Sequence, residues 1–374
     1  MRVLLTTYLL RGGVLTHVWD LVYHLEQAGV SVSVAILKKN PALKTQGKIY
    51  RAKSLPSMLG PIEKVPFIYY ETPQELGEFC RKQKIDLIHA HSRLAFPSSL
   101  VTAKRLKIPL IVTLHGVFRW NRFYPSTLSY SQKIIAIGPA QTKGAERHNE
   151  KIEIIANGID TIRFCPSFNR SLTRLKNLKV LWFGRTDKQS SRGVEALDQA
   201  IGILRAQGKI IDAWLLGRPI DASIHNLKNL GWSNNPVPIL QTGHLAFGHG
   251  RALREAMSCG NVGFLLGHGY GGQITSSWFS GEQEKPISAI PDYQLAEPDA
   301  NKIAADISSY LHNRHLLYQH RLEARDIAIK HFDVRTMVAG IIRVYRQCVQ
   351  TPLKKNNKAS AQLTMRGVDP YAQF

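Results

Sequence analysis

Residues 2–37 read RVLLTTYLLRGGVLTHVWDLVYHLEQAGVSVSVAIL and combine three patterns in a fixed order. Residues 2–7 are a short apolar run typical of a buried strand, and Gly12 and Gly13 follow as a loop. A helix is predicted next, because apolar side chains recur at helical spacing, namely Val18, Leu21, Val22 and Leu25. With a second strand at residues 31–37, this stretch predicts the opening unit of a doubly wound parallel sheet.

The same alternation of strands and helices recurs in two series along the chain. Further strands are predicted at residues 86–91, 110–114, 133–137 and 153–155, and then at 179–183, 213–216, 238–245 and 262–266. Helices are predicted at residues 193–207, 251–258, 302–314, 316–331 and 334–349, and residues 38–73 are predicted to be loops.

A chain of 374 residues suits about two domains. We predict one Rossmann-like domain at residues 1–168 and a second at 169–333. The helix at 334–350 is expected to return to the first domain. The basic tail at 351–374 has few core-forming residues and is expected to be disordered.

Charge and cysteine content narrow the possible partners and compartment. Lysine and arginine total 49 against 27 acidic residues, so the formal net charge is +22, and the excess is spread over both halves. The four cysteines have neither metal-site nor disulfide spacing, which favours a reducing cytoplasm. No signal peptide and no run of about 20 apolar residues is recognised, so a cytoplasmic protein is expected.

A basic protein attracts anions such as nucleotides or acidic lipid head groups. Two interpretations of the charge stay open: peripheral attachment to an anionic membrane surface, on its inner face, or a merely basic soluble protein. Nucleic acid is not an expected partner, because no nucleic-acid-binding motif accompanies the charge.

Polar residues follow several of the predicted strands. In open parallel sheets, ligands bind outside the carboxyl ends of the strands. The residues at such ends are Gly12, Gly13, His89, His91, His115 and Arg185, together with Glu255 on the helix after another strand. Their repeated placement predicts a working site in the cleft between the two domains.

An ordered series of motifs resembles family-4 glycosyltransferases. The motifs are GG at 12–13 with His17, DLIHAH at 86–91, TLHG at 113–116, NGID at 157–160 followed by Phe164 and Pro166, FGR at 183–185 and RALREAMSCG at 251–260. The resemblance spans residues 1 to about 350. It implies the GT-B fold, in which two Rossmann-like parallel-sheet domains face each other and a C-terminal helix crosses back.

The resemblance also implies an activity. Such enzymes are retaining hexosyltransferases that move a sugar from a nucleotide diphosphate sugar, here UDP- or GDP-linked, to a glycan or lipid-linked acceptor. Given the positive charge, a lipid-linked or cell-surface polysaccharide precursor is the expected acceptor. No metal ion or cofactor is expected, and no protein nucleophile is required, because the leaving phosphate helps to deprotonate the acceptor on the same face.

In the first domain, the resemblance gives roles to Gly12, Gly13 and His115. The glycines let backbone N–H groups approach a diphosphate at a helix N-terminus. His115 is expected to line the reacting centre as the catalytic residue, where imidazole can hydrogen-bond a hydroxyl or stabilise developing charge. On local grounds alone, a simple turn and a structural histidine remain alternatives.

In the second domain, Arg185 is expected to bind phosphate oxygens through its forked guanidinium. A second cation should follow in the same loop; Arg192 is preferred and Lys188 is the alternative. Glu255 is expected to accept ribose hydroxyls. Gly271 and Gly272 belong to a glycine-rich stretch that resembles the family's turn near the donor. The local alternatives are surface ion pairs, a solvated helix face and a flexible loop.

The sequence departs from the family at Phe247, where a glutamate eight residues before Glu255 usually contacts the donor sugar. Phenylalanine cannot accept those hydrogen bonds, so His249 or Arg251 is expected to substitute. The departure keeps a rival hypothesis open, in which a degenerate GT-B protein binds nucleotide or glycan without turnover. A basic membrane-surface or polyanion-binding scaffold is a third hypothesis.

Two histidines in one strand raise the question of a metal. His89 and His91 are expected to alternate across the strand, so that only one of them faces the site. A metal site built on them needs a third ligand, which the sequence does not identify.

Overall fold

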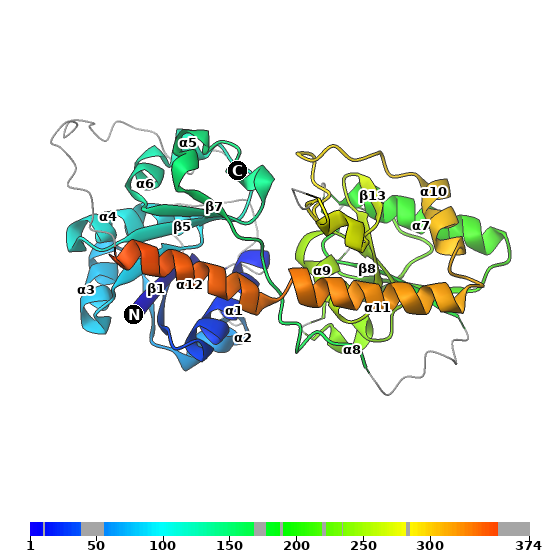
Figure 1. Ribbon diagram of the computed structural model, residues 1–374, viewed down its shortest axis with the longest axis horizontal. Coiled ribbons are helices and arrows are strands. Elements are labelled where there is room, and N and C mark those ends of the chain that lie inside the picture. The colour runs from blue at the N-terminus through cyan, green and yellow to red at the C-terminus, as the bar shows by residue number, and fades with distance from the viewer. Residues whose placement is uncertain are drawn as a thin grey trace. The chain divides into compact units, whose positions relative to one another are not determined.

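The computed structural model describes residues 1–9, 12–38, 56–167, 177–187, 190–218, 222–233, 235–281 and 285–350. The chain divides into two compact units (Figure 1). The first comprises the described residues of Met1–Asn157 and those from Arg335 onward, and the second is Gly158–Val334, whereas the sequence placed the division after residue 168. The predicted tail at 351–374 lies outside the described residues.

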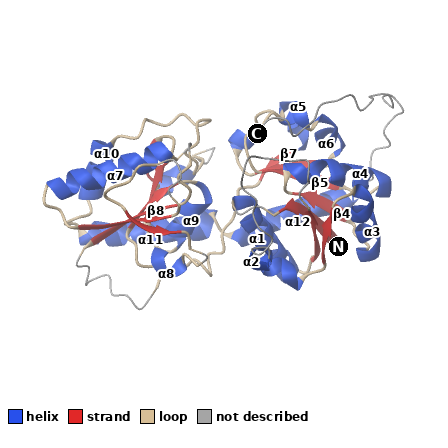
Figure 2. Ribbon diagram, turned by 180° about the vertical axis from the view of Figure 1, so that it is seen from behind, coloured by secondary structure: helices blue, strands red, loops and turns tan. Residues whose placement is uncertain are grey.

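The first unit is built on a seven-stranded parallel sheet in the order β3-β2-β1-β4-β5-β6-β7. Its strands are β1 (Arg2–Tyr8), β2 (Ser31–Leu37), β3 (Phe67–Tyr70), β4 (Leu87–Ala90), β5 (Leu110–Leu114), β6 (Lys133–Ala136) and β7 (Ile152–Ile154). Its helices are α1 (Gly13–Gln27), α2 (Pro56–Leu59), α3 (Pro73–Gln83), α4 (Phe96–Leu106), α5 (Trp120–Phe123), α6 (Pro125–Tyr130) and α12 (Val334–Gln350). Figure 2 shows these helices around the sheet.

Side-chain alternation along β4 explains how both faces of this sheet are covered. Ile88 and Ala90 join the core formed with α3 and α4. His89 points the other way and contacts Tyr345 of α12, so the last helix lies on the opposite face. Because both faces are buried, the strands are apolar almost throughout, as parallel sheets require.

The second unit carries a six-stranded sheet in the order β10-β9-β8-β11-β12-β13, parallel except for the β12–β13 pair. Its strands are β8 (Leu178–Phe183), β9 (Ile211–Leu216), β10 (Lys228–Gly231), β11 (Leu245–Gly248), β12 (Val262–Leu266) and β13 (Tyr270–Gln273). Its helices are α7 (Ser191–Ala206), α8 (Val237–Leu240), α9 (Gly250–Ser258), α10 (Ala300–Ser308) and α11 (Arg314–His331).

Each sheet has a switch point, where the chain turns from building one side of the sheet to building the other. In the first unit β1 lies between β2 and β4, and in the second β8 lies between β9 and β11. Ligand sites of open α/β sheets lie beside such points, at the carboxyl ends of the strands. The topology therefore singles out the loops after β1 and β4, and those after β8 and β11.

The structure differs from the sequence predictions at two places and adds a third feature. The strand predicted at 238–245 is wrong, because helix α8 occupies residues 237–240 and the strand begins only at Leu245. The predicted loop at 38–73 contains β3, whose four residues are too few for a clear pattern. The second sheet ends in the antiparallel strand β13, which follows β12 through a turn too short for a crossover.

Candidate functional site

Glycines end the three central strands of the second unit. Gly184 follows β8, Gly217 follows β9 and Gly248 ends β11. A Cβ on Gly217 would lie 2.2 Å from the carbonyl oxygen of Gly184, and Gly248 has a φ of +154°. Only glycine fits these positions. The chemistry of this edge therefore comes from the residues that follow the glycines.

Helix α7 begins against a backbone turn of the same unit. A Cβ on Gly193, in its first turn, would lie 2.6 Å from the carbonyl oxygen of Gly267. The N–H of Gly267 in turn donates to the carbonyl of Gly269 over 3.0 Å. Amides in the first turn of a helix have no intrahelical acceptor, and the helix dipole favours an anion there. This end of α7 can therefore receive phosphate oxygens.

Gly271 and Gly272 were predicted to belong to that turn, and this is wrong. They lie in strand β13, which is hydrogen-bonded to β12, because the turn is already complete at Gly269. A Cβ on Gly271 would lie 2.8 Å from the Leu265 side chain, so packing against the neighbouring strand accounts for this glycine. Contact of the pair with a donor stays a prediction.

Two predicted cations lie beside the start of α7. Arg185 is 74% exposed, and its Nε lies 3.5 Å from Oδ2 of Asp187. Arg192 lies in the first turn of α7, 3.1 Å from Glu297. Exposed ion pairs contribute at most about 1 kcal/mol, so an incoming phosphate can compete for either guanidinium. Lys188, the alternative second cation, lies outside the described residues.

His249 connects the starts of α7 and α9. It occupies the N-cap position of α9 without a side-chain capping bond, and its Nε2 lies 3.0 Å from Oγ of Ser190 just before α7. Burial, and secondarily Arg185, lowers the pKa of His249 to about 4, so the ring is neutral at pH 7. Ser190 was missed by sequence reasoning, although a serine directly before an amphipathic helix is a recognisable N-terminal signal.

Glu255 lies in α9 with its side chain 9% exposed. Arg251, one turn earlier, donates from Nε to its Oε1 over 2.7 Å and from a guanidinium nitrogen to the Gly158 carbonyl over 3.2 Å. The carboxylate is thus held in a fixed orientation. It does not lie on a solvated helix face, which was the local alternative. Arg251 orients Glu255 here.

Phe247 has no exposed surface and belongs to the core between the sheet and helices α7 and α10. The departure from the family pattern therefore falls on a packing residue. Substitution of the missing glutamate by His249 or Arg251 stays a prediction.

In the first unit, Gly12 and Gly13 begin α1 directly after the switch-point strand β1. Gly12 has a φ of +150°, and a Cβ on either glycine would meet nothing within 4 Å among the described residues. The carbonyl of Gly12 accepts hydrogen bonds from the backbone and hydroxyl of Thr16. Backbone conformation, rather than crowding, thus favours glycine at position 12.

Three histidines meet at the carboxyl edge of the same sheet. His17 comes from α1, His91 follows β4 and His115 follows β5. One ring nitrogen of each lies within 4.8 Å of the others. His17 belongs to the glycine motif of the sequence but was not predicted as a site residue, although its position one turn into α1 beside Gly13 indicates its place here.

The expected alternation of His89 and His91 is wrong, because residues two apart lie on the same face of a strand. Their ring centroids lie 4.0 Å apart. His89 hydrogen-bonds through both nitrogens, to Tyr345 and to Thr113, each over 2.7 Å.

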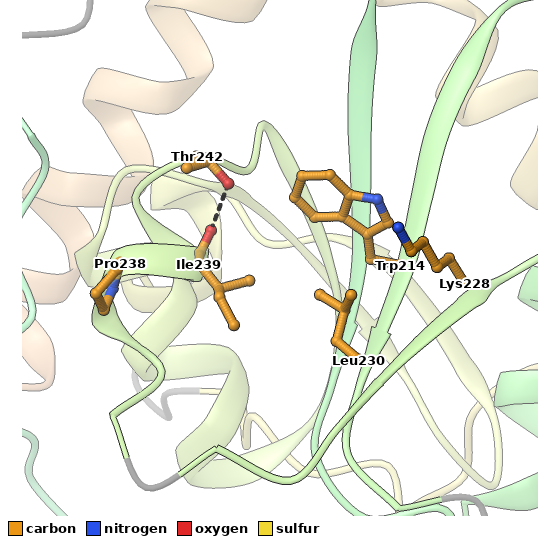
Figure 3. A pocket seen from close by; sticks show the side chains of 6 residues that line it. All are labelled: Trp214, Lys228, Leu230, Pro238, Ile239 and Thr242. Carbon is orange, nitrogen blue, oxygen red and sulfur yellow. Dashed lines mark hydrogen bonds between the residues drawn. The ribbon is translucent and has the colours of Figure 1, made fainter.

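A shallow hollow of about 410 Å³ lies elsewhere in the second unit, lined by residues of β9, β10 and α8 and the turn after it (Figure 3). Its lining residues are Trp214, Lys228, Leu230, Pro238, Ile239 and Thr242. None of the predicted site residues lines it. Among the described residues, no helix is both long and apolar enough to cross a membrane.

Comparison with known proteins agrees with this architecture. Residues 11–163 match the family model described as Glycosyltransferase Family 4. No curated protein matches the chain by sequence. The expected family resemblance is confirmed for that segment.

Several solved structures are similar to this fold over nearly the whole chain. HepE from Anabaena, in complex with UDP and glucose, is 16% identical with a TM-score of 0.64, over 92% of this chain and 99% of that one. A glycosyltransferase from Rickettsia africae is 15% identical with a TM-score of 0.67, over 94% and 99%. Sucrose-phosphate synthase from Thermosynechococcus elongatus is 15% identical with a TM-score of 0.60, over 93% and 98%. The chain has the GT-B fold, as predicted, and carries the sequence pattern of family-4 glycosyltransferases at residues 11–163.

Proposed function

We propose that this protein is a retaining glycosyltransferase that moves a sugar from a UDP- or GDP-sugar to a glycan or lipid-linked acceptor. One observation carries the proposal. At the switch point of the second unit, the N-terminus of α7 is accompanied by Arg185, Arg192 and His249, and the fixed carboxylate of Glu255 lies on α9. Positive charge beside an oriented carboxylate suits a nucleoside diphosphate.

In this proposal the amides of α7 and the two arginines bind the diphosphate and stabilise the charge that develops as it departs. The Glu255 carboxylate accepts hydrogen bonds from two ribose hydroxyls. Arg251 contributes by keeping that carboxylate in one orientation. Gly271 and Gly272 are assigned to the donor side of the same site.

Residues of the first unit receive roles on the strength of the family pattern in residues 11–163. Gly12 and Gly13 offer exposed backbone to the donor phosphates or the acceptor. His115 hydrogen-bonds a hydroxyl at the reacting centre. Burial lowers its pKa to about 3, so it acts as a neutral imidazole rather than as a cation. The leaving phosphate receives the acceptor proton, and transfer proceeds on one face of the sugar.

One structural relative guides the choice of donor. HepE, which shares the fold, is described in complex with UDP and with UDP-glucose, which makes UDP the first donor nucleotide to test.

The charge of the protein guides the proposal on its location. The net charge of +22 favours binding to an anionic surface, and we propose a cytoplasmic protein that attaches peripherally to the inner face of a membrane.

Titration calorimetry with UDP and GDP tests the donor site. Micromolar binding is expected, and Arg185→Ala should weaken it at least tenfold. Lys330→Ala is a matched control, because it removes an exposed, ion-paired cation from α11 of the same unit. Absence of binding to either nucleotide would contradict the proposal.

The rival is a GT-B protein that binds nucleotide or glycan without turnover. It is favoured by the absence of a carboxylate at position 247. Mass spectrometry of donor hydrolysis or transfer separates the two hypotheses. Turnover that Glu255→Ala abolishes supports the enzyme, whereas nucleotide binding without turnover of any donor supports the rival.

A further inference from the structure

We propose that His17, His91 and His115 form a binding site for a divalent transition metal ion such as Zn²⁺ or Co²⁺. The three side chains come from three separate elements of the first unit and converge at the carboxyl edge of its sheet. One ring nitrogen of each lies within 4.8 Å of the other two. Three imidazoles with an open fourth position form a known tetrahedral metal site.

The pair His91 and His115 already has the spacing of two ligands on one ion. Nδ1 of His91 lies 3.4 Å from Nε2 of His115. Metal–nitrogen bonds of about 2.1 Å in tetrahedral geometry place neighbouring ligand atoms about 3.4 Å apart. An ion bound there draws the His17 ring inward to complete the set.

The buried ring of His91 is incompletely hydrogen-bonded. The side chain is 1% exposed, and its Nε2 has no hydrogen-bond partner among the described residues. A buried polar atom without a partner is costly, and such atoms are uncommon in folded proteins. The cluster therefore includes a buried imidazole whose hydrogen bonds are incomplete.

His89 supports the cluster without joining it. Its hydrogen bonds to Tyr345 and Thr113 occupy both ring nitrogens, so it has no lone pair to offer. Its ring centroid lies 4.0 Å from that of His91 and packs directly against it. Helix α12 thereby fixes the ring against which His91 rests.

The donor set determines the kind of ion. The cluster identified among the described residues is made of imidazoles alone, without a carboxylate. Mg²⁺ and Ca²⁺ prefer oxygen ligands, whereas imidazole suits zinc, cobalt, nickel and copper. Selectivity for transition metals over Mg²⁺ is therefore expected.

Absorption spectroscopy with Co²⁺ tests the site on the full, tag-free chain. One equivalent of Co²⁺ should produce the intense visible bands of tetrahedral cobalt, without the charge-transfer band of a thiolate ligand. Zn²⁺ should remove these bands and Mg²⁺ should not. His91→Gln and His115→Gln should each weaken binding at least tenfold, whereas His24→Gln, on the same helix as His17, should leave it unchanged.

Folding of each variant is followed by circular dichroism. His115→Gln provides a second test if the fully buried His91 tolerates no change. The same samples are titrated with UDP, because the metal site does not rest on the proposed transferase activity. A chain that binds UDP but shows no tetrahedral cobalt, or whose cobalt spectrum survives both substitutions, overturns the metal site alone. Cobalt binding without nucleotide binding contradicts the transferase alone.

Discussion

Phe247 stacks on Phe264 of the neighbouring strand, with ring centroids 4.7 Å apart and planes inclined by 11°. Both rings are almost completely buried in the core under α7 and α10. The position at which family-4 enzymes usually carry a glutamate is therefore occupied here by a core residue. A carboxylate in its place would enter an apolar layer rather than meet a sugar.

Restoring the family residue should consequently unfold the second unit rather than improve donor binding. Phe247→Ala is expected to cost about 3–5 kcal/mol, as for other buried phenylalanines. Phe247→Glu should cost at least as much, because it buries a charge without a partner. Urea unfolding followed by tryptophan fluorescence measures both. A Phe247→Glu variant with unchanged stability and tighter donor binding would contradict this placement.

The Arg251–Glu255 pair should contribute to stability as a unit. Removing one partner leaves the other poorly compensated at 15% or 9% exposure, so Arg251→Ala should cost about 3 kcal/mol. The double Ala variant should lose less than the sum of the two single variants. The exposed pair Lys330–Asp326 serves as the comparison and should show a coupling below about 0.5 kcal/mol. Additive losses at 251 and 255 would count against a fixed carboxylate.

Sequence patterns predicted the elements that carry the sites, because strand ends and glycine loops are local features. The loops after β1 and β8 and the helix with Glu255 could be placed without knowledge of tertiary contacts. The cluster of His17, His91 and His115 could not be predicted from the sequence, because it depends on strand order. Strand β1 lies beside β4 and β4 lies beside β5, which brings the three histidines together.

Side-chain direction was the second limit of sequence reasoning. A phenylalanine at a strand end can be a core residue or can replace a ligand-binding residue. Only its packing with residues of α7 and α10 shows that Phe247 is a core residue. Likewise, His89 and His91 lie two residues apart and therefore on the same face of the strand. Only the contacts of His89 with Tyr345 and Thr113 show that it does not join the cluster.

Acid should destabilise the second unit partly through His244. This ring is 3% exposed, and its Nδ1 accepts a hydrogen bond from the backbone N–H of Lys179 over 2.9 Å. Burial, with smaller contributions from Arg321 and Lys179, lowers its pKa from 6.5 to about 3. Between these values the unfolded chain binds a proton that the folded protein does not, so stability falls as the pH drops from about 6.5 toward 3.

At pH 5 the loss from this histidine should be about 2 kcal/mol relative to pH 7.5. His244→Asn keeps a hydrogen-bond acceptor but cannot titrate, and should therefore remove about one proton from the uptake on unfolding at pH 5. Urea unfolding across this pH range measures the slope, with the exposed His315→Asn as control. An unchanged slope in His244→Asn would show that other groups dominate.

The close approach of α7 to the Gly267 turn gives opposite expectations for two glycines at helix starts. A Cβ on Gly193 would lie 2.6–3.0 Å from three backbone atoms of Gly267, so Gly193→Ala must displace the start of α7. It should lower stability and weaken UDP binding at least tenfold, although alanine favours helix by about 1 kcal/mol. A Cβ on Gly13 in the first turn of α1 meets nothing within 4 Å, so Gly13→Ala should keep or raise the melting temperature. Equal shifts in the two variants, measured by calorimetry, would mean that backbone contact at Gly267 does not position α7.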